Sequence, residues 1–552
     1  MLNETKAKSP MRAKAHENYM GGLSYDLSPF ARLYVMATSS FFGEGGYYED
    51  VRRNKDKKEF IALSRAKKSG DIEYIETVLG SFGTEMHNMM SGRNRKEAMV
   101  KALEDALDYD AELTLCFLGW LRQKAFMRAT PAVGLAVASH SEIVRGSGKI
   151  REFAPNILSR LDDVSNCLAF YLKEYGKPIP NALKRALASR LASANSYELA
   201  KYAGKNKMVT MRDVIRLTHA HSNAIDSFCK EEISQATEGQ ETWEAIISKE
   251  GSTKEAWTKA VKVMGHMALL RNLRNLEKVG VDESLYLDKL VARAKTGKQL
   301  PFRYYSAISN VTSNAIREAL EKCIDISVEN LPKLPGKSLI LVDNSGSAKY
   351  ENVSALSNVN VATCGNLMGV LTARISDSGK IGMFGDKIKF LPVNKGIAGT
   401  VLSVLDVVND MGDTVGSATE NGIWLALDEI TRRKEKFDRI FIYSDMQAGH
   451  GGLYGYSSQA YPKYRGDSVN IDVPKLVAKY RQEVSPDCKL YSVQIGGYSD
   501  NIFPEFYPNT CILGGWSPEL LRFVHMFEKG VVSIEDQFRK EFGLEKKQLK
   551  NK

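Results

Sequence analysis

Apolar residues recur every three to four positions through most of the first 335 residues, which is the spacing of amphipathic helices. The pattern is clearest in RKEAMVKALEDALDYDAELTLCFLGWLRQKAFM, ALKRALASRLASA and EAWTKAVKVMGHMALLRNLRNLEKVG. Runs typical of strands are missing from this part, so we expect it to be mainly helical. Many short amphipathic helices in one block favour stacked helix pairs, in a ring or a solenoid, over a compact bundle.

The pattern changes after ENLPKLPGK at 329–337, where two prolines and a glycine follow a helical segment. Apolar strand-like runs then appear in SLILVD, DRIFIYSD and CKLYSVQIGG. GKIGMFGDKIKFLPV reads as a β-hairpin, and PELLRFVHMF as a late helix. A chain of 552 residues is too long for one core. We therefore expect a helical domain over 1–335 and an α/β domain over 336–552.

The strand LILVD runs directly into a short polar tip that carries Asp343, Ser345 and Ser347. One carboxylate and two hydroxyls, two residues apart, are hard oxygen ligands that suit a divalent cation such as Mg²⁺. The alternative is that these are ordinary turn residues at the end of a strand. The motif is short and could occur by chance, so the prediction of a cation site depends on further oxygen ligands elsewhere in the chain.

Two later segments supply such partners. Asp445 follows the apolar run IFIYS, and Thr419 lies in a Gly- and Ser-rich turn just before a helical pattern. In open α/β sheets, ligands bind outside the carboxyl ends of the strands. Three separate segments would therefore bring oxygen ligands to one edge of the sheet, which predicts a cation site there.

These segments resemble the metal-ion-dependent adhesion site of a von Willebrand factor A-type domain. That family has a Rossmann-like, mostly parallel sheet flanked by helices. The resemblance implies one divalent cation, Mg²⁺ with Ca²⁺ or Mn²⁺ as alternatives, in a binding site that is not catalytic. Glu420 stands where relatives carry Asp.

Charge is unevenly divided between the two parts, although the net charge is only +10. After residue 335 there are 26 Lys and Arg against 25 Asp and Glu, of totals of 76 and 66. The first 335 residues therefore hold 50 basic and 41 acidic residues and carry most of the net positive charge. Basic residues concentrate at 184–216, where only Glu198 and Asp213 oppose them. Arg212, Arg216 and His219 have helical spacing, which predicts one shared face for phosphate contacts. A solvated helix surface is the alternative.

The helical part carries a second resemblance, to the TROVE module of the Ro autoantigen family. The segments that carry it are GLSYDLSPFARLYVMATSSFFGEGGYYED, AKYAGKNKMVTMRDVIRLTHAHSN, WTKAVKVMGHMALLRNLRNL and LPFRYYSAIS. Ro proteins join a ring of HEAT-like helical repeats to an A-type domain, and the resemblance covers nearly the whole chain. Alignment puts Lys201, Lys205 and His219 on RNA-contact positions, with one inserted residue between Lys205 and His219.

The resemblance implies binding of Y RNA-like small RNAs outside the ring and of misfolded RNA ends in its central hole. The expected function is noncatalytic and lies in small-RNA stability or RNA quality control. We expect a monomer that has an exoribonuclease as a further partner and does not bind DNA. The alternative is a metal-dependent adaptor of a ribonucleoprotein or nuclease complex. A metal-dependent RNA-processing enzyme ranks last. The Gly- and Tyr-rich segment 449–468 reads either as an RNA-stacking loop or as a surface insertion.

Composition and cysteine usage favour a cytoplasmic protein. Hydrophobic residues make up 43% and charged residues 26% of the chain, as in ordinary globular proteins. No apolar stretch approaches the roughly 18 residues of a membrane span, and MLNETKAKSPMRAK lacks the apolar core of a secretory signal. Seven scattered cysteines without a CxxC pair favour reduced thiols over a zinc site.

Overall fold

The fold was taken from a computed structural model. It describes residues 14–17, 23–39, 72–203, 209–230, 242–297, 299, 301–329, 331–350, 359–394, 399–416, 422–446, 472–496, 500–515, 518–530 and 533–544. Two of the predicted site residues, Lys205 and Thr419, lie outside these residues, as does the segment 449–468. Among the described residues, no helix is both long and apolar enough to cross a membrane.

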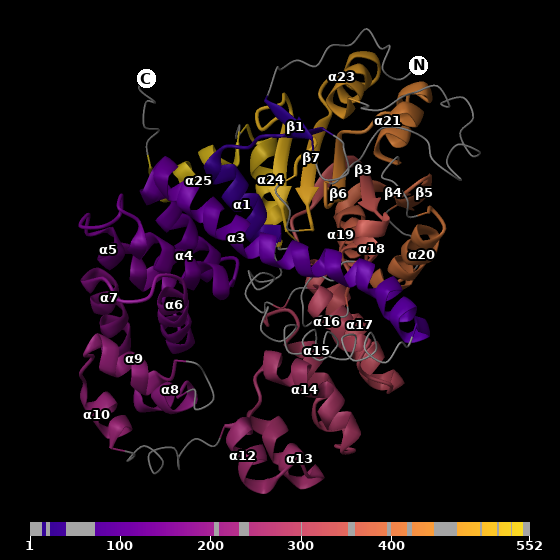
Figure 1. Cartoon of the computed structure of the whole chain (residues 1–552). Coiled ribbons are helices and arrows are strands. Elements are labelled where there is room, and N and C mark those ends of the chain that lie inside the picture. The colour runs from indigo at the N-terminus through magenta and orange to yellow at the C-terminus, as the bar shows by residue number, and fades with distance from the viewer. Residues whose placement is uncertain are drawn as a thin grey trace.

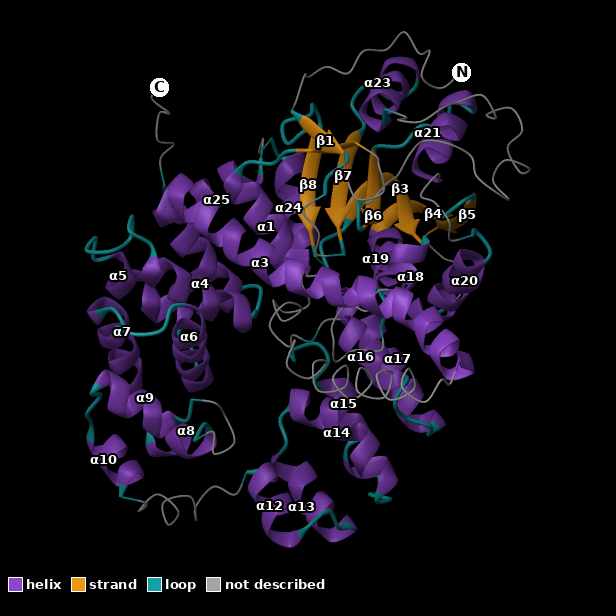
Figure 2. Cartoon of the chain, in the orientation of Figure 1, coloured by secondary structure: helices purple, strands orange, loops and turns teal. Residues whose placement is uncertain are grey.

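The described residues of the first part form helices and one small hairpin (Figures 1 and 2). Its elements are β1 (Ala15–Glu17), β2 (Leu23–Tyr25), α1 (Pro29–Ser39), α3 (Ile72–Gln123), α4 (Ala129–His140), α5 (Lys149–Ile157), α6 (Leu161–Glu174), α7 (Asn181–Ala192), α8 (Ser196–Lys201), α9 (Met211–Thr218), α10 (Asn223–Cys229), α12 (Trp243–Glu250), α13 (Lys254–Val263), α14 (His266–Lys278), the 3-10 helix η3 (Glu283–Leu285), α15 (Leu287–Ala292), α16 (Pro301–Ile308) and α17 (Asn314–Glu329).

The second part alternates strands with helices. Its elements are β3 (Leu334–Asp343), α18 (Gly346–Tyr350), α19 (Val361–Ile375), β4 (Ser376–Phe384), β5 (Ile388–Asn394), α20 (Val401–Asp413), α21 (Gly422–Arg432), β6 (Arg439–Ser444), α23 (Val473–Glu483), β7 (Lys489–Gln494), β8 (Thr510–Gly514), α24 (Pro518–Glu528) and α25 (Ile534–Phe542). These elements confirm the predicted fold class of N-terminal helices followed by an α/β part.

Six strands form one sheet in the order β5-β4-β3-β6-β7-β8. All neighbours are parallel except β4 and β5, which form the predicted antiparallel hairpin. Side chains of β3 alternate between two cores, as the period of two requires. Leu339 and Leu341 pack with α21 and α23, whereas Ile340 and Val342 join the core that extends into the helical part.

The helices of the first part follow one another along an arc whose two ends both reach the sheet (Figure 1). Along one arm α3 packs on α4, α4 on α6, and α7 on α9; along the other α13 packs on α14, α14 on α16, and α16 on α17. The first arm meets the sheet through α1, which packs on β8, and the second through α17, which packs on α19 and α20. The sheet and the helical arc therefore share extensive contacts.

Helices near both ends of the described chain pack against the other part, across the boundary predicted between residues 335 and 336. In sequence, α17 ends at Glu329 and β3 begins at Leu334. In space, α1 packs against the sheet and α25 packs against α3. The ring of Phe538 in α25 lies 5.0 Å from Trp120 and 5.2 Å from Phe117, both in α3, measured between ring centroids. The C-terminal helix therefore contributes to the core of the helical part.

A buried histidine of the helical part predicts acid sensitivity. His266 Nε2 lies 2.7 Å from the Tyr304 hydroxyl, and burial, followed by the nearby Arg293, lowers the pKa of His266 below its usual value. The unfolded chain therefore takes up a proton as the pH falls below about 6.5, and the folded protein resists it. Stability should fall in that range, and urea titrations of His266→Gln should show a smaller fall. Equal pH dependence in both proteins would contradict the assignment.

Candidate metal centre and nucleic-acid interface

The tips of two adjacent parallel strands bring four of the five predicted metal ligands together. Asp343 ends β3 and Asp445 follows β6, and the register pairs Val342 with Tyr443. Both carboxylates are fully buried. The backbone N–H of Ser345 donates to Asp343 Oδ1 at 2.8 Å, and the hydroxyls of Ser345 and Ser347 lie 3.2 Å apart. Oxygen donors from both segments therefore converge at one edge of the sheet.

Two polar residues that the sequence did not single out support this edge, one through the carboxylate of Asp343 and the other through the backbone of Asp445. The Ser444 hydroxyl donates to Asp343 Oδ2 at 2.7 Å. Gln494, at the end of β7, donates through Nε2 to the carbonyl of Asp445 at 2.7 Å. Each is a buried polar residue at the carboxyl end of its strand. That position could have identified them, because polar groups buried there need hydrogen-bond partners.

The predicted ligand Thr419 lies outside the described residues, but the residues on either side of its segment are fixed beside β4. The N–H of Lys387 donates to the carbonyl of Val415 at 2.9 Å, and the N–H of Gly422 donates to the carbonyl of Gly385 at 3.2 Å. The strand β4 is the immediate neighbour of β3. Both ends of the segment are thus anchored near the strand that carries Asp343.

The donor set fits a small divalent cation. Burial raises the pKa of Asp343, and hydrogen bonds from Ser345, Ser444 and the Asp445 backbone oppose that rise. Among the described residues, no group of three or more His, Cys, Asp or Glu side chains is arranged to hold a metal ion. The predicted set of two carboxylates and three hydroxyls, with the Thr419 hydroxyl outside the described residues, is an all-oxygen set of the kind Mg²⁺ prefers.

The predicted nucleic-acid surface is partly formed by α9. Its buried face carries Met211, Val214, Ile215 and Thr218, so Arg212 and Arg216 are exposed on the opposite side. The helix ends at Thr218, and His219 follows it with a left-handed backbone (φ 56°). The helical spacing argument therefore holds for the two arginines but not for His219, which is exposed just beyond the helix.

Aromatic rings lie beside the basic groups of this surface, and one of them, Phe228, is itself buried. Lys201, at the end of α8, places Nζ 5.5 Å from the ring centroid of Tyr197 and 5.9 Å from that of Tyr202. The Arg212 guanidinium lies 5.8 Å from the ring of Phe228. Basic groups beside aromatic rings suit a polyanion whose bases can stack. Lys205, the remaining predicted contact, lies outside the described residues.

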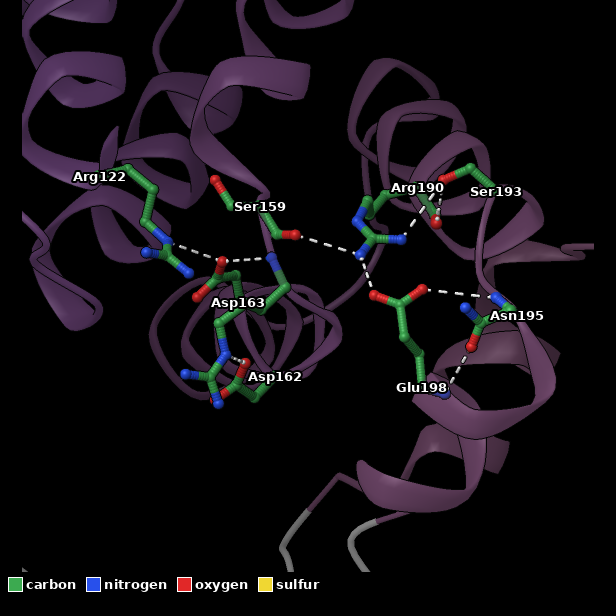
Figure 3. A network of polar contacts seen from close by, with 9 residues as sticks. Arg122, Ser159, Asp162, Asp163, Arg190, Ser193, Asn195 and Glu198 are labelled. Carbon is green, nitrogen blue, oxygen red and sulfur yellow. Dashed lines mark hydrogen bonds and ion pairs between the residues drawn. The ribbon is translucent and has the colours of Figure 1, made fainter. Parts of the chain in front are cut away.

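One arginine of the basic segment is instead used to hold helices together (Figure 3). Arg190 Nη2 donates to Glu198 Oε1 at 2.7 Å and to the carbonyl of Ser159 at 3.1 Å. Glu198 in turn belongs to the capping box that begins α8, with Asn195 as the cap. Arg190 therefore joins α7 and α8 to the start of α6 and sets the position of the helix that ends in Lys201.

Comparison with known proteins gives two matches. A family model described as the TROVE domain matches residues 235–317. No curated protein matches the chain. Among solved structures, the crystal structure of the Deinococcus radiodurans RO (RSR) protein is similar, with a TM-score of 0.50 and 16% sequence identity. The similarity covers 76% of this chain and 92% of that chain.

Proposed function

The TROVE domain and the Ro-like fold support a Ro-family TROVE protein, and from this premise we propose that the chain is a noncatalytic RNA-binding protein. Its ligands would be small structured RNAs similar to Y RNAs and the ends of misfolded RNAs. Its role would lie in small-RNA stability or RNA quality control. A similar fold does not by itself carry a function from one protein to another, so the proposal for this chain depends on its own residues.

The observation that carries the proposal is the exposed surface formed by α8, α9 and the residues that follow α9. Lys201, Arg212, Arg216 and His219 are all exposed there. The carboxylate of Asp213, the acidic residue nearest to the arginines in sequence, is bound by the Thr210 backbone and hydroxyl at 2.9 and 2.6 Å. Positive charge with neighbouring aromatic rings favours a polyanionic partner with stackable bases.

The metal centre supports a binding role for the sheet part. The cation would be held by Asp343, Ser345, Ser347, Thr419 and Asp445, and its chemistry would be to coordinate an oxygen from a partner. The chain's own contribution is to bury two carboxylates at one sheet edge, to orient that of Asp343 through Ser444 and to fix the backbone of Asp445 through Gln494. The expected site holds one cation, whereas two-metal phosphoryl chemistry uses a pair of cations, so RNA cleavage is not part of the proposed function.

The test is RNA binding by the double variant Arg212→Ala/Arg216→Ala. Losing two phosphate contacts should weaken binding of a stem–loop RNA with a single-stranded 3′ end about tenfold or more. It should also lower the slope of log affinity against log salt by about 1.4 to 1.8, at roughly 0.7 to 0.9 per contact. Fluorescence anisotropy over a salt series measures both quantities.

The matched control is Arg432→Ala/Arg433→Ala, which removes the same charge from the last residue of α21 and the residue after it, in the sheet part. Both arginines are surface residues in ion pairs four positions from their partners. If the two double variants bound RNA equally well with equal salt slopes, α9 would not be a phosphate-binding surface. Circular dichroism of each variant would confirm that the helices remain folded.

A further inference from the structure

An arginine from a different helix joins the basic and aromatic groups at the end of α8. Arg160 is the residue before α6, and its guanidinium carbon lies 5.1 Å from the centroid of the Tyr202 ring. Tyr202 directly follows α8. The same ring lies 5.9 Å from Lys201 Nζ. One tyrosine therefore has two cationic groups beside it, and only Lys201 was predicted from the sequence.

The Arg160 guanidinium is held from two directions. Its Nε donates to Asp162 Oδ1 at 2.9 Å, and the Tyr202 ring lies beside it. The side chain of Asp162 is 15% exposed, whereas that of Arg160 is 33% exposed. A planar cation that is already oriented loses less freedom when it binds a ligand. Part of Arg160 is thus both oriented and open to solvent.

Backbone hydrogen bonds fix Tyr202 close to α9. The N–H of Tyr202 donates to the carbonyl of Glu198 at 3.0 Å, and the N–H of Met211 donates to the carbonyl of Ala203 at 3.2 Å. Ala203 follows Tyr202, and Met211 precedes Arg212. The aromatic ring and the first arginine of α9 therefore belong to residues on either side of one backbone hydrogen bond.

The contacts of Arg190 hold Arg160 near the same ring (Figure 3). Arg190 Nη2 binds the Glu198 carboxylate and the carbonyl of Ser159, the residue before Arg160. The start of α6 and the end of α8 are thus joined by one buried-side guanidinium whose side chain is only 16% exposed. The arrangement of Arg160 against Tyr202 is therefore formed without a ligand.

We propose that Arg160, supported by the Tyr202 ring, stacks on an unpaired base of the bound RNA. Unpaired RNA bases stack on aromatic rings and on arginine guanidinium planes, and every base has a flat face to offer. Lys201 and Arg212, on either side of the site, neutralise the phosphates of neighbouring nucleotides. The site therefore favours RNA in which an unpaired nucleotide adjoins a stem over a continuous duplex. This inference rests on the proposed RNA-binding function.

Removing single bases from the RNA tests the site in the full chain. The ligand is a stem–loop RNA with a single-stranded 3′ end, in which each unpaired nucleotide in turn is made abasic, and fluorescence anisotropy gives the affinity. For the unaltered protein, at least one abasic position should weaken binding by about fivefold or more, the lower end for one stacked base. Arg160→Lys keeps the charge but removes the planar group. It should bind the complete RNA more weakly by the same factor and should not respond to that position, because both changes remove one contact.

Two further variants complete the test. Tyr202→Leu removes the ring that supports Arg160, and it should lose the dependence on the same base while circular dichroism shows that the helices remain folded. Arg151→Lys is the matched control, because it makes the same change at an exposed arginine of α5. It should respond to every abasic RNA as the unaltered protein does, and a blunt duplex of the stem should bind equally well to Arg160→Lys, Arg151→Lys and the unaltered protein.

The outcomes separate the stacking site from the proposed function. The site is overturned if the same abasic position weakens binding equally in Arg160→Lys and in the unaltered protein. It is also overturned if no abasic position weakens binding of the unaltered protein while Arg212→Ala/Arg216→Ala still reduces affinity and salt slope, a result that leaves the proposed function standing. If the unaltered protein does not bind the RNA at all, the proposed function and the stacking site are both wrong.

Discussion

Replacing Arg539 with alanine is expected to lower the free energy of unfolding by about 3–5 kcal/mol, the usual cost of removing one partner from a buried ion pair. The Arg539 side chain is only 8% exposed, and its Nη2 lies 2.9 Å from Asp110 Oδ2, whose side chain is 5% exposed. Its Nε lies 2.7 Å from Glu535 Oε1. Alanine would leave two carboxylates in a buried position without the guanidinium that balances them.

The effect should reach beyond the ion pair because Asp110 also interrupts and restarts α3. Its backbone is non-helical (φ −156°, ψ 98°), and its Oδ1 accepts hydrogen bonds of 3.1 Å from the N–H groups of Glu112 and Leu113. These are the contacts of a helix N-cap. Arg539 thus fixes the residue on which the second half of α3 begins, and α1 and α4 both pack on α3.

Urea unfolding followed by circular dichroism measures the loss, with Arg433→Ala as the matched control. Arg433 also pairs with a glutamate four residues earlier, Glu429 at 3.0 Å, but its side chain is 64% exposed. An exposed pair of this kind contributes about 0–1 kcal/mol. If Arg539→Ala cost no more than Arg433→Ala, the buried network would not stabilise the docking of α25.

The two-part architecture could be predicted because it depends on local periodicity. Apolar spacing of three to four residues distinguished the helices, and the apolar run ending at Asp343 marked β3. The docking of α25 on α3 could not be predicted in the same way. Asp110 and Arg539 are separated by 429 positions, and no local pattern encodes a partner at that distance. The same limit applies to α1, because its apolar residues predict a buried face but do not identify β8 as the strand on which it packs.

The candidate sites were predictable to different degrees. The carboxyl ends of parallel strands meet at one edge, so the sequence pattern was enough to place Asp343 and Asp445 together. Helical spacing placed Arg212 and Arg216 on one face, as the structure has them, but it extended the helix one residue too far, to His219, where the backbone becomes left-handed. The basic segment predicted from the sequence also included Arg190. The number of charged residues in a segment cannot show that the Glu198 carboxylate and the Ser159 carbonyl already bind this arginine.

Replacing Asp343 with asparagine is expected to remove nearly all of the stabilisation that Mg²⁺ gives the protein. A ligand at 100 times its dissociation constant adds about 2.7 kcal/mol to the free energy of unfolding. Asparagine keeps the size of the side chain and an oxygen for the Ser345 N–H, but it removes the charge that a cation needs. Thermal unfolding with Mg²⁺ and with EDTA measures the difference.

In EDTA the difference in stability between Asp343→Asn and the unaltered protein should vanish or reverse in sign, which makes this test specific to the cation. Burial raises the pKa of Asp343, so the fold disfavours the charged carboxylate above its unfolded pKa. The neutral asparagine avoids that cost, and the variant should be at least as stable as the unaltered protein when no cation is present. Asp413→Asn is the control, because that carboxylate is 78% exposed and lies 3.5 Å from Lys349, outside the predicted ligand set. It should keep the full response to Mg²⁺, and an equal response in Asp343→Asn would show that the buried strand tips do not bind the cation.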